Sequence, residues 1–139
     1  MIDARLLGST NRAPEVTDRN QLVTGQEKPS RFYLGATASN GVAVNVVPPE
    51  SGKKFIITGI WIDGDRSIGA NGAVTDVFEN SVGPTDGTIT KQVIQAEVPK
   101  QDTRPFSPLY IETTQGRWIN VKSDDVIVRC NIAGYYVDA

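Results

Sequence analysis

Hydrophobic and polar positions alternate with a period of two over several short runs of this chain, as expected for β-strands that bury one face. In one run, Val128, Cys130 and Ile132 alternate with Arg129 and Asn131. Glycine-, proline- or asparagine-rich turns interrupt the runs every 8 to 15 residues, and a helical period is absent apart from a possible single turn near residues 67–70. The pattern predicts about eight strands: 31–38, 42–46, 53–63, 73–79, 88–98, 109–114, 117–122 and 126–133, the last continuing as 135–137 after a bulge or a bend at Gly134.

Two turn sequences predict which strands pair. Asn40-Gly41 predicts a hairpin between 31–38 and 42–46, since both central positions of a type I′ turn need positive φ. Gln115-Gly116 predicts a second hairpin between 109–114 and 117–122. The segment 99–108 holds three prolines and is predicted to be a loop.

The most apolar run is Lys53 to Asp63. A regular strand directs one set of its apolar side chains to one face: Phe55, Ile57 and Trp61. It directs the other set to the opposite face: Ile56, Ile60 and Ile62. A strand that is apolar on both faces is buried on both, either inside the domain or between subunits. The candidates for a subunit interface are Ile56, Ile60, Ile62 and Tyr136.

Residues 1–30 differ from the rest of the chain. They carry scattered charges and small apolar groups, with neither a helical stripe nor a long alternation. They are either a mobile tail or an extended arm that lies on a neighbouring molecule. The second alternative is favoured because a solvated tail gains nothing from exposed apolar side chains. The partner-binding candidates of this arm are Leu6, Leu7, Val16, Leu22 and Val23.

The composition supports an all-β fold. Valine, isoleucine and threonine together number 39 of 139 residues, whereas leucine occurs five times, and β-branched side chains favour strands. We therefore expect a jelly-roll-like two-sheet β-sandwich over residues 31–139, preceded by the extended N-terminal arm of residues 1–30.

The charge and hydropathy of the chain limit the classes of partner that we expect. A net charge of −2 gives no electrostatic reason to expect nucleic acid. No apolar run approaches the roughly 20 residues that cross a bilayer, and the first residues do not resemble a signal peptide. We expect no membrane partner and synthesis in a host cytoplasm.

The chain has few of the side chains that enzymes use as catalytic groups. The chain has no histidine, the commonest general base, and a single cysteine, Cys130, which excludes an intrachain disulfide. Its position in the alternation predicts a buried, unreactive thiol. The serines fall in turns or in the arm, and no nucleophile or phosphate-binding motif occurs. We expect no enzymatic activity and no cofactor.

Two aspartate pairs, Asp63 with Asp65 and Asp124 with Asp125, are candidates for acid–base chemistry, and Asp63 and Asp65 with Asn71 are also a candidate calcium site. All four aspartates lie in predicted turns, where aspartate bonds the nearby backbone. A role in the turns is preferred, and no metal is expected.

The aromatic residues leave an alternative function open. Trp61 and Trp118 lie within strands, which favours a core or an interface, whereas Tyr135 and Tyr136 point to opposite faces, so only one joins the core. The other tyrosine, with the acidic loop from Asp63 to Asn71, would suit a carbohydrate-binding or host-adhesion module.

The layout resembles small virion proteins of tailed bacteriophages, of the capsid decoration, cement or head-fibre class. The similar features are the arm with NQLVT at 20–24, the turn and apolar strand VVPPESGKKFIITGI at 46–60, and the ending WINVK at 118–122 with VIVRCNIAGYY at 126–136. The resemblance implies a jelly-roll-like fold, a homo-oligomer with a trimer favoured, and attachment to the major capsid protein. The expected function is that of a non-enzymatic cement protein on the capsid surface of a virion, with its arm across capsid subunits.

Overall fold

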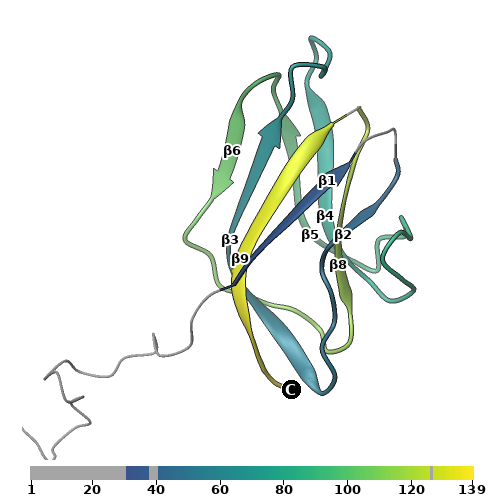
Figure 1. Ribbon diagram of the computed structural model, residues 1–139, viewed down its shortest axis with the longest axis vertical. Coiled ribbons are helices and arrows are strands. Elements are labelled where there is room, and N and C mark those ends of the chain that lie inside the picture. Colours follow the sequence, from purple (N-terminus) through teal and green to yellow (C-terminus); the bar gives the residue numbers. More distant parts are fainter. Residues whose placement is uncertain (1–30, 38–40, 126) are drawn as a thin grey trace, which may run out of the picture.

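The computed structural model describes residues 31–37, 41–125 and 127–139, and its regular elements there are all strands (Figure 1). In chain order they are β1 (Arg31–Thr37), β2 (Val44–Val47), β3 (Lys53–Gly64), β4 (Ala73–Asn80), β5 (Lys91–Val98), β6 (Thr103–Phe106), β7 (Ile111–Glu112), β8 (Trp118–Ser123) and β9 (Val128–Asp138). The described residues include no helix that could cross a bilayer.

The strands form two antiparallel sheets that face each other (Figure 1). One sheet has the order β1-β9-β3-β6, with the short β7 also paired to β3; the other has the order β2-β8-β4-β5. The predicted two-sheet β-sandwich is confirmed. Its more specific jelly-roll character and the domain boundary after residue 30 stay predictions.

The core between the sheets is made of the inward-facing β-branched side chains. Ile57, Ile60 and Ile62 of β3 meet Val77 of β4 and Val121 of β8, and each of these five side chains is fully buried. Burial of a Val or Ile side chain is worth about 1.5 to 3 kcal/mol, so this interior is the main source of stability.

A β-bulge in β3 changes the predicted division of its faces. The register to β9 shifts between Ile57 and Gly59, which inserts Thr58 as an unpaired position. Phe55 and Ile57 therefore share the core face with Ile60 and Ile62, and Trp61 lies on the outer face. The regular alternation assumed from the sequence was wrong in this respect, because an extra residue reverses the direction of every later side chain.

Both predicted hairpins are also wrong. β1 pairs with β9 at the opposite end of the described chain, and β2 pairs with β8 in the other sheet. β7 pairs with β3, whereas β8 lies between β2 and β4. Turn residues specify where the chain reverses, but the sheet that each strand joins depends on where its apolar face is buried.

The proline-containing segment 99–108 holds a strand that the sequence did not predict. Thr103–Phe106 forms β6 at the sheet edge, with Pro105 opposite Trp61. Proline is compatible with an edge strand because its missing N–H has no partner to lose there.

Gly134 lies opposite a bulge, although the extra residue belongs to β3 and not to β9. It pairs with Ile57 directly beside the register shift, because Gly59 is the partner of the preceding residue, Ala133. A Cβ on Gly134 would lie 2.0 Å from the carbonyl oxygen of Ile56 and 2.5 Å from the Phe55 ring. Close packing against β3 therefore explains the glycine.

Candidate interaction surface

The outer face of the β1-β9-β3-β6 sheet carries exposed apolar side chains, which we call the outer apolar face. Phe32 and Leu34 of β1 are 71% and 67% exposed. Their cross-strand partners in β9 are Ala133 and Asn131. Large apolar side chains that gather on one exposed face mark an interaction surface.

Trp61 extends this face toward β6. Its ring lies 6.1 Å from the Phe32 ring, at an interplanar angle of 39°. It also covers Gly59, since Cη2 and Cζ3 of the indole would stand 2.5 and 2.9 Å from a Cβ at that position. The bulge at Thr58 places both Gly59 and Trp61 on the outer side, and the missing side chain at Gly59 lets the indole lie against the sheet.

Three residues predicted for a subunit interface are covered within the single chain. Ile60 and Ile62 belong to the core and are 0% exposed. Ile56 lies on the outer side, next to Tyr135 and Glu112 on the neighbouring strands, yet it is only 1% exposed. The first of the two alternatives, burial inside the domain, therefore accounts for β3, and these isoleucines present no surface to a second subunit.

Tyr136, the fourth interface candidate, is half-buried and bonded within the chain. Its ring packs edge-on against Phe55 at 5.0 Å between centroids, and its hydroxyl donates a 2.6 Å hydrogen bond to the carbonyl of Pro48. Burial raises the pKa of Tyr136, and the Tyr33 hydroxyl beside it raises it further. As predicted, Tyr135 and Tyr136 point to opposite faces, with Tyr136 toward the core.

The arm candidates Leu6, Leu7, Val16, Leu22 and Val23 lie outside the described residues. The first described residue, Arg31, begins β1, the strand that carries Phe32 and Leu34.

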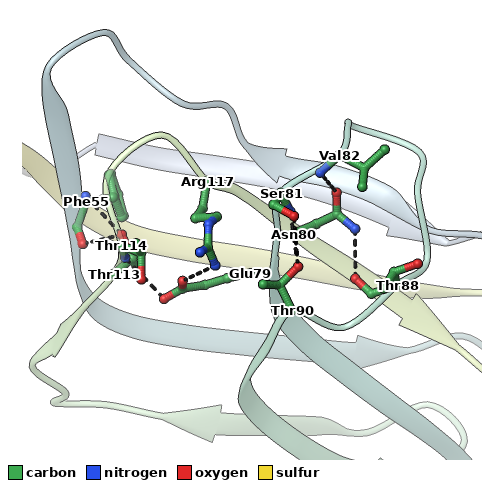
Figure 2. Close-up of polar contacts among 10 residues, drawn as sticks. All are labelled: Phe55, Glu79, Asn80, Ser81, Val82, Thr88, Thr90, Thr113, Thr114 and Arg117. Carbon is green, nitrogen blue, oxygen red and sulfur yellow. Dashed lines mark hydrogen bonds and ion pairs between the residues drawn. The ribbon is translucent and has the colours of Figure 1, made fainter.

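A buried carboxylate lies beside the connection between β7 and β8. Glu79 is 0% exposed and faces inward beside Ile119. Its Oε1 lies 3.5 Å from Nη1 of Arg117, and its Oε2 accepts a 3.2 Å hydrogen bond from the N–H of Thr114 (Figure 2). Thr113, the preceding residue, holds the backbone of Phe55 through its hydroxyl (Figure 2).

Glu79 holds the connection between β7 and β8 against β4, and Thr113 of the same connection bonds to β3 in the other sheet. The charge of Arg117 and the N–H of Thr114 partly compensate this buried carboxylate, whereas its Oε1 accepts no hydrogen bond from the described residues. The sequence reasoning missed Glu79. The only indication in the sequence was that Glu79 follows Thr75 and Val77 at a spacing of two residues, which places all three on the same face of a strand.

Asn80 and Asn120 hold the 81–90 segment against the outer face of the second sheet. The Asn80 amide donates to Asp86 Oδ1 at 2.7 Å. It also donates to the Thr88 carbonyl at 2.7 Å, and its oxygen accepts the N–H of Val82 (Figure 2). The Asn120 amide donates to the carbonyl of Gly83 at 3.0 Å. Phe78 lies on this outer face and is nevertheless 0% exposed.

The aspartates considered for chemistry bond to other parts of the chain. Asp63 lies in β3 and not in the predicted turn, and its Oδ1 accepts a hydrogen bond from the hydroxyl of Thr103 in β6. Asp65 Oδ2 accepts the N–H and the hydroxyl of Ser67, and the backbone bond is the main reason that its pKa is lowered. Asp124 and Asp125 accept the backbone N–H groups of Val74 and Gly69. Among the described residues, no three His, Cys, Asp or Glu side chains gather where they could hold a metal ion.

Cys130 is buried in the core, as predicted. Burial raises the pKa of its thiol to about 12, and a thiol is much less reactive than its thiolate.

No protein-family model matches the chain, and none of the curated proteins is significantly similar to it in sequence. Among solved structures, it is similar to a chain of the cyanophage Pam1 capsid asymmetric unit, with 13% identity and a TM-score of 0.43 over 88% of this chain and 99% of that one. A likeness of this strength assigns neither a fold family nor a function.

Proposed function

We propose that this protein is a non-enzymatic structural component of a tailed-phage virion. In this proposal it binds the outside of the capsid through the major capsid protein and stabilises the shell as a cement or decoration protein. Residues 1–30 lie across capsid subunits, and the sandwiches associate as a homo-oligomer, with a trimer favoured.

The observation that carries the proposal is the outer apolar face, Phe32 with Leu34 and Trp61, on the sheet that contains β1, the strand that follows residues 1–30 in the sequence. Apolar surface of this kind gains about 25 cal/mol per Å² when a partner covers it, before the costs of association. A capsid repeats the same contact many times, so contacts that are individually weak act together. The sequence resemblance to phage cement proteins supplies the partner class.

Co-expression with the major capsid protein encoded in the same genome tests the proposal. We expect the full chain to co-sediment with assembled shells, and the Leu6→Asp/Leu7→Asp variant to be lost from that fraction. The matched control is Tyr110→Asp, which changes a 69% exposed side chain away from β1. Failure of the unaltered chain to bind any assembled shell would remove the proposed function.

The alternative, a carbohydrate-binding or host-adhesion module, has one observation in its favour. The indole of Trp61 lies along the sheet above Gly59, and flat aromatic surfaces suit the stacking of sugar rings. A glycan array with the full chain and with Trp61→Ala separates the two functions, because only a glycan-binding module gives hits that depend on Trp61.

A further inference from the structure

The four sheet edges of the described sandwich are not equally protected against the addition of another strand. β2 has four residues and an irregular register, and Pro48 and Pro49 follow it. β5 begins with Lys91 and carries Glu97, and β6 contains Arg104 and Pro105. Short length, irregular register, charge and proline are the features that discourage edge-to-edge pairing.

β1 lacks these protective features along its length. After Arg31 it continues as Phe-Tyr-Leu-Gly-Ala-Thr, without charge or proline, and its register with β9 is regular over all seven residues. Its other edge has no strand partner among the described residues. The same strand contributes Phe32 and Leu34 to the outer apolar face, so an added strand would gain both backbone hydrogen bonds and apolar contacts.

The occupant must be extended, uncharged and apolar on at least one side. Within residues 1–30 the best match is 20–24, Asn-Gln-Leu-Val-Thr, which lies in an uncharged stretch from Asn20 to Gln26. Leu6 and Leu7 fit less well because Asp3 and Arg5 lie close to them.

A second copy of the chain suits this docking better than the same copy. Pro29 has a fixed φ, and the residue before a proline is biased toward extended conformations, which favours docking on a neighbouring copy over a sharp reversal before β1. A hairpin within one copy would need a loop over residues 25–30, longer than common hairpin loops. Residues 24–30, if extended, span about 23 Å, which reaches an adjacent sandwich.

We propose that residues 20–24 of a second copy add as a strand to the free edge of β1, with Leu22 packed beside Phe32 and Leu34. This inference rests on the proposed function only in how it divides the contacts of the arm. Leu22 and Val23 contact a second copy, and Leu6, Leu7 and Val16 contact the capsid protein. Repeated around a symmetry axis, the exchange gives a closed ring such as a trimer.

Cysteine cross-linking of the full chain tests the contact without any capsid protein. Leu22→Cys and Leu34→Cys chains with different affinity tags are co-expressed and oxidised with copper phenanthroline. Cys130 is fully buried and does not compete. We expect a disulfide between residues 22 and 34 of different chains, at twice the mass of 15.0 kDa. Phe32→Cys in place of Leu34→Cys covers a register shifted by two residues.

The matched control is Leu22→Cys with Val82→Cys, since Val82 is 69% exposed and Leu34 is 67% exposed. Cross-linking at residues 32 and 34 no stronger than at residue 82 would overturn the proposal. A link that forms only within a chain carrying both Leu22→Cys and Leu34→Cys would overturn the second copy as its source.

Sedimentation equilibrium gives a second measurement. The unaltered chain should exceed 15.0 kDa, and Leu34→Asp should reduce it to the monomer mass while Val82→Asp does not. A monomeric unaltered chain would contradict the inference. Because neither assay contains capsid protein, failure here is distinct from failure of the proposed function.

Discussion

The indole of Trp61 lies across Gly59, with its Cη2 only 2.5 Å from the point that a Cβ at residue 59 would occupy. Gly59 therefore determines how the largest side chain of the outer apolar face is presented. The contact depends on the bulge at Thr58, which turns Gly59 and Trp61 to the same outer side of β3.

Substitution of Gly59 by alanine should lift the Trp61 ring from the sheet. We expect a loss of about 1 to 3 kcal/mol of unfolding free energy, as for other substitutions that overfill a packed site, and a red shift of tryptophan emission as the indole gains solvent. Gly83→Ala is the control, because a Cβ there meets nothing within 4 Å. Identical emission spectra for the two variants would contradict this account of Trp61.

Gly134→Ala should destabilise the sandwich more severely. The added Cβ would meet the backbone oxygen of Ile56 at 2.0 Å, and a backbone atom in a central strand pair cannot move aside as a side chain does. We expect a loss of about 3 kcal/mol or more, measured by urea unfolding against Gly83→Ala. Equal midpoints for the two variants would show that β3 and β9 separate more easily than their register suggests.

The buried pair of Glu79 and Arg117 should respond unequally to removal of its two members. Arg117→Ala leaves a fully buried carboxylate without its cation and should cost about 3 kcal/mol. Glu79→Gln should cost about 1 kcal/mol, because the Arg117 side chain is 27% exposed and is solvated without its partner.

Urea unfolding of both variants checks this order. The control is Lys53→Ala, which breaks the exposed pair with Asp138 and should cost no more than about 1 kcal/mol. A larger loss for Glu79→Gln than for Arg117→Ala would mean that the carboxylate is not the costly partner.

The ionisation of Asp86 should make the free energy of unfolding depend on pH in the acid range. The side-chain hydrogen bond from Asn80 lowers the pKa of Asp86, and the N–H of Thr88 lowers it further. The folded chain therefore holds this proton less tightly than the unfolded chain, whose aspartates titrate near about 3.9. The contribution is complete above that pH and is lost as the pH falls toward the lower folded pKa.

The Asp86→Asn variant checks this contribution. Its urea midpoint should fall less between pH 6 and pH 3 than that of the unaltered chain, with Asp102→Asn as the control for an exposed aspartate. An unchanged pH dependence in Asp86→Asn would show that the bonds to Asn80 and Thr88 do not favour the charged form.

The sequence predicted the positions of most strands correctly, but it did not predict which strands pair with one another. The alternation around Cys130 correctly predicted both a strand and a buried thiol, since both depend on neighbours two residues apart. The hairpins predicted at Asn40-Gly41 and Gln115-Gly116 failed, because β1 and β8 pair with strands distant in the sequence. The candidate surface was missed as well. Phe32 was recognised only as part of a strand, and Trp61 was assigned to the same side as Phe55.

The sequence by itself determined that this chain forms short β-strands, where most of them lie, and that its one thiol is buried. These properties follow from side-chain volume, branching and two-residue periodicity, which act locally. Only the tertiary structure decided the strand order, the bulge at Thr58, the burial of Glu79 and the exposure of Phe32 and Leu34. Each of these depends on which surfaces cover one another, and the free energy of burial is gained between residues that the sequence places far apart.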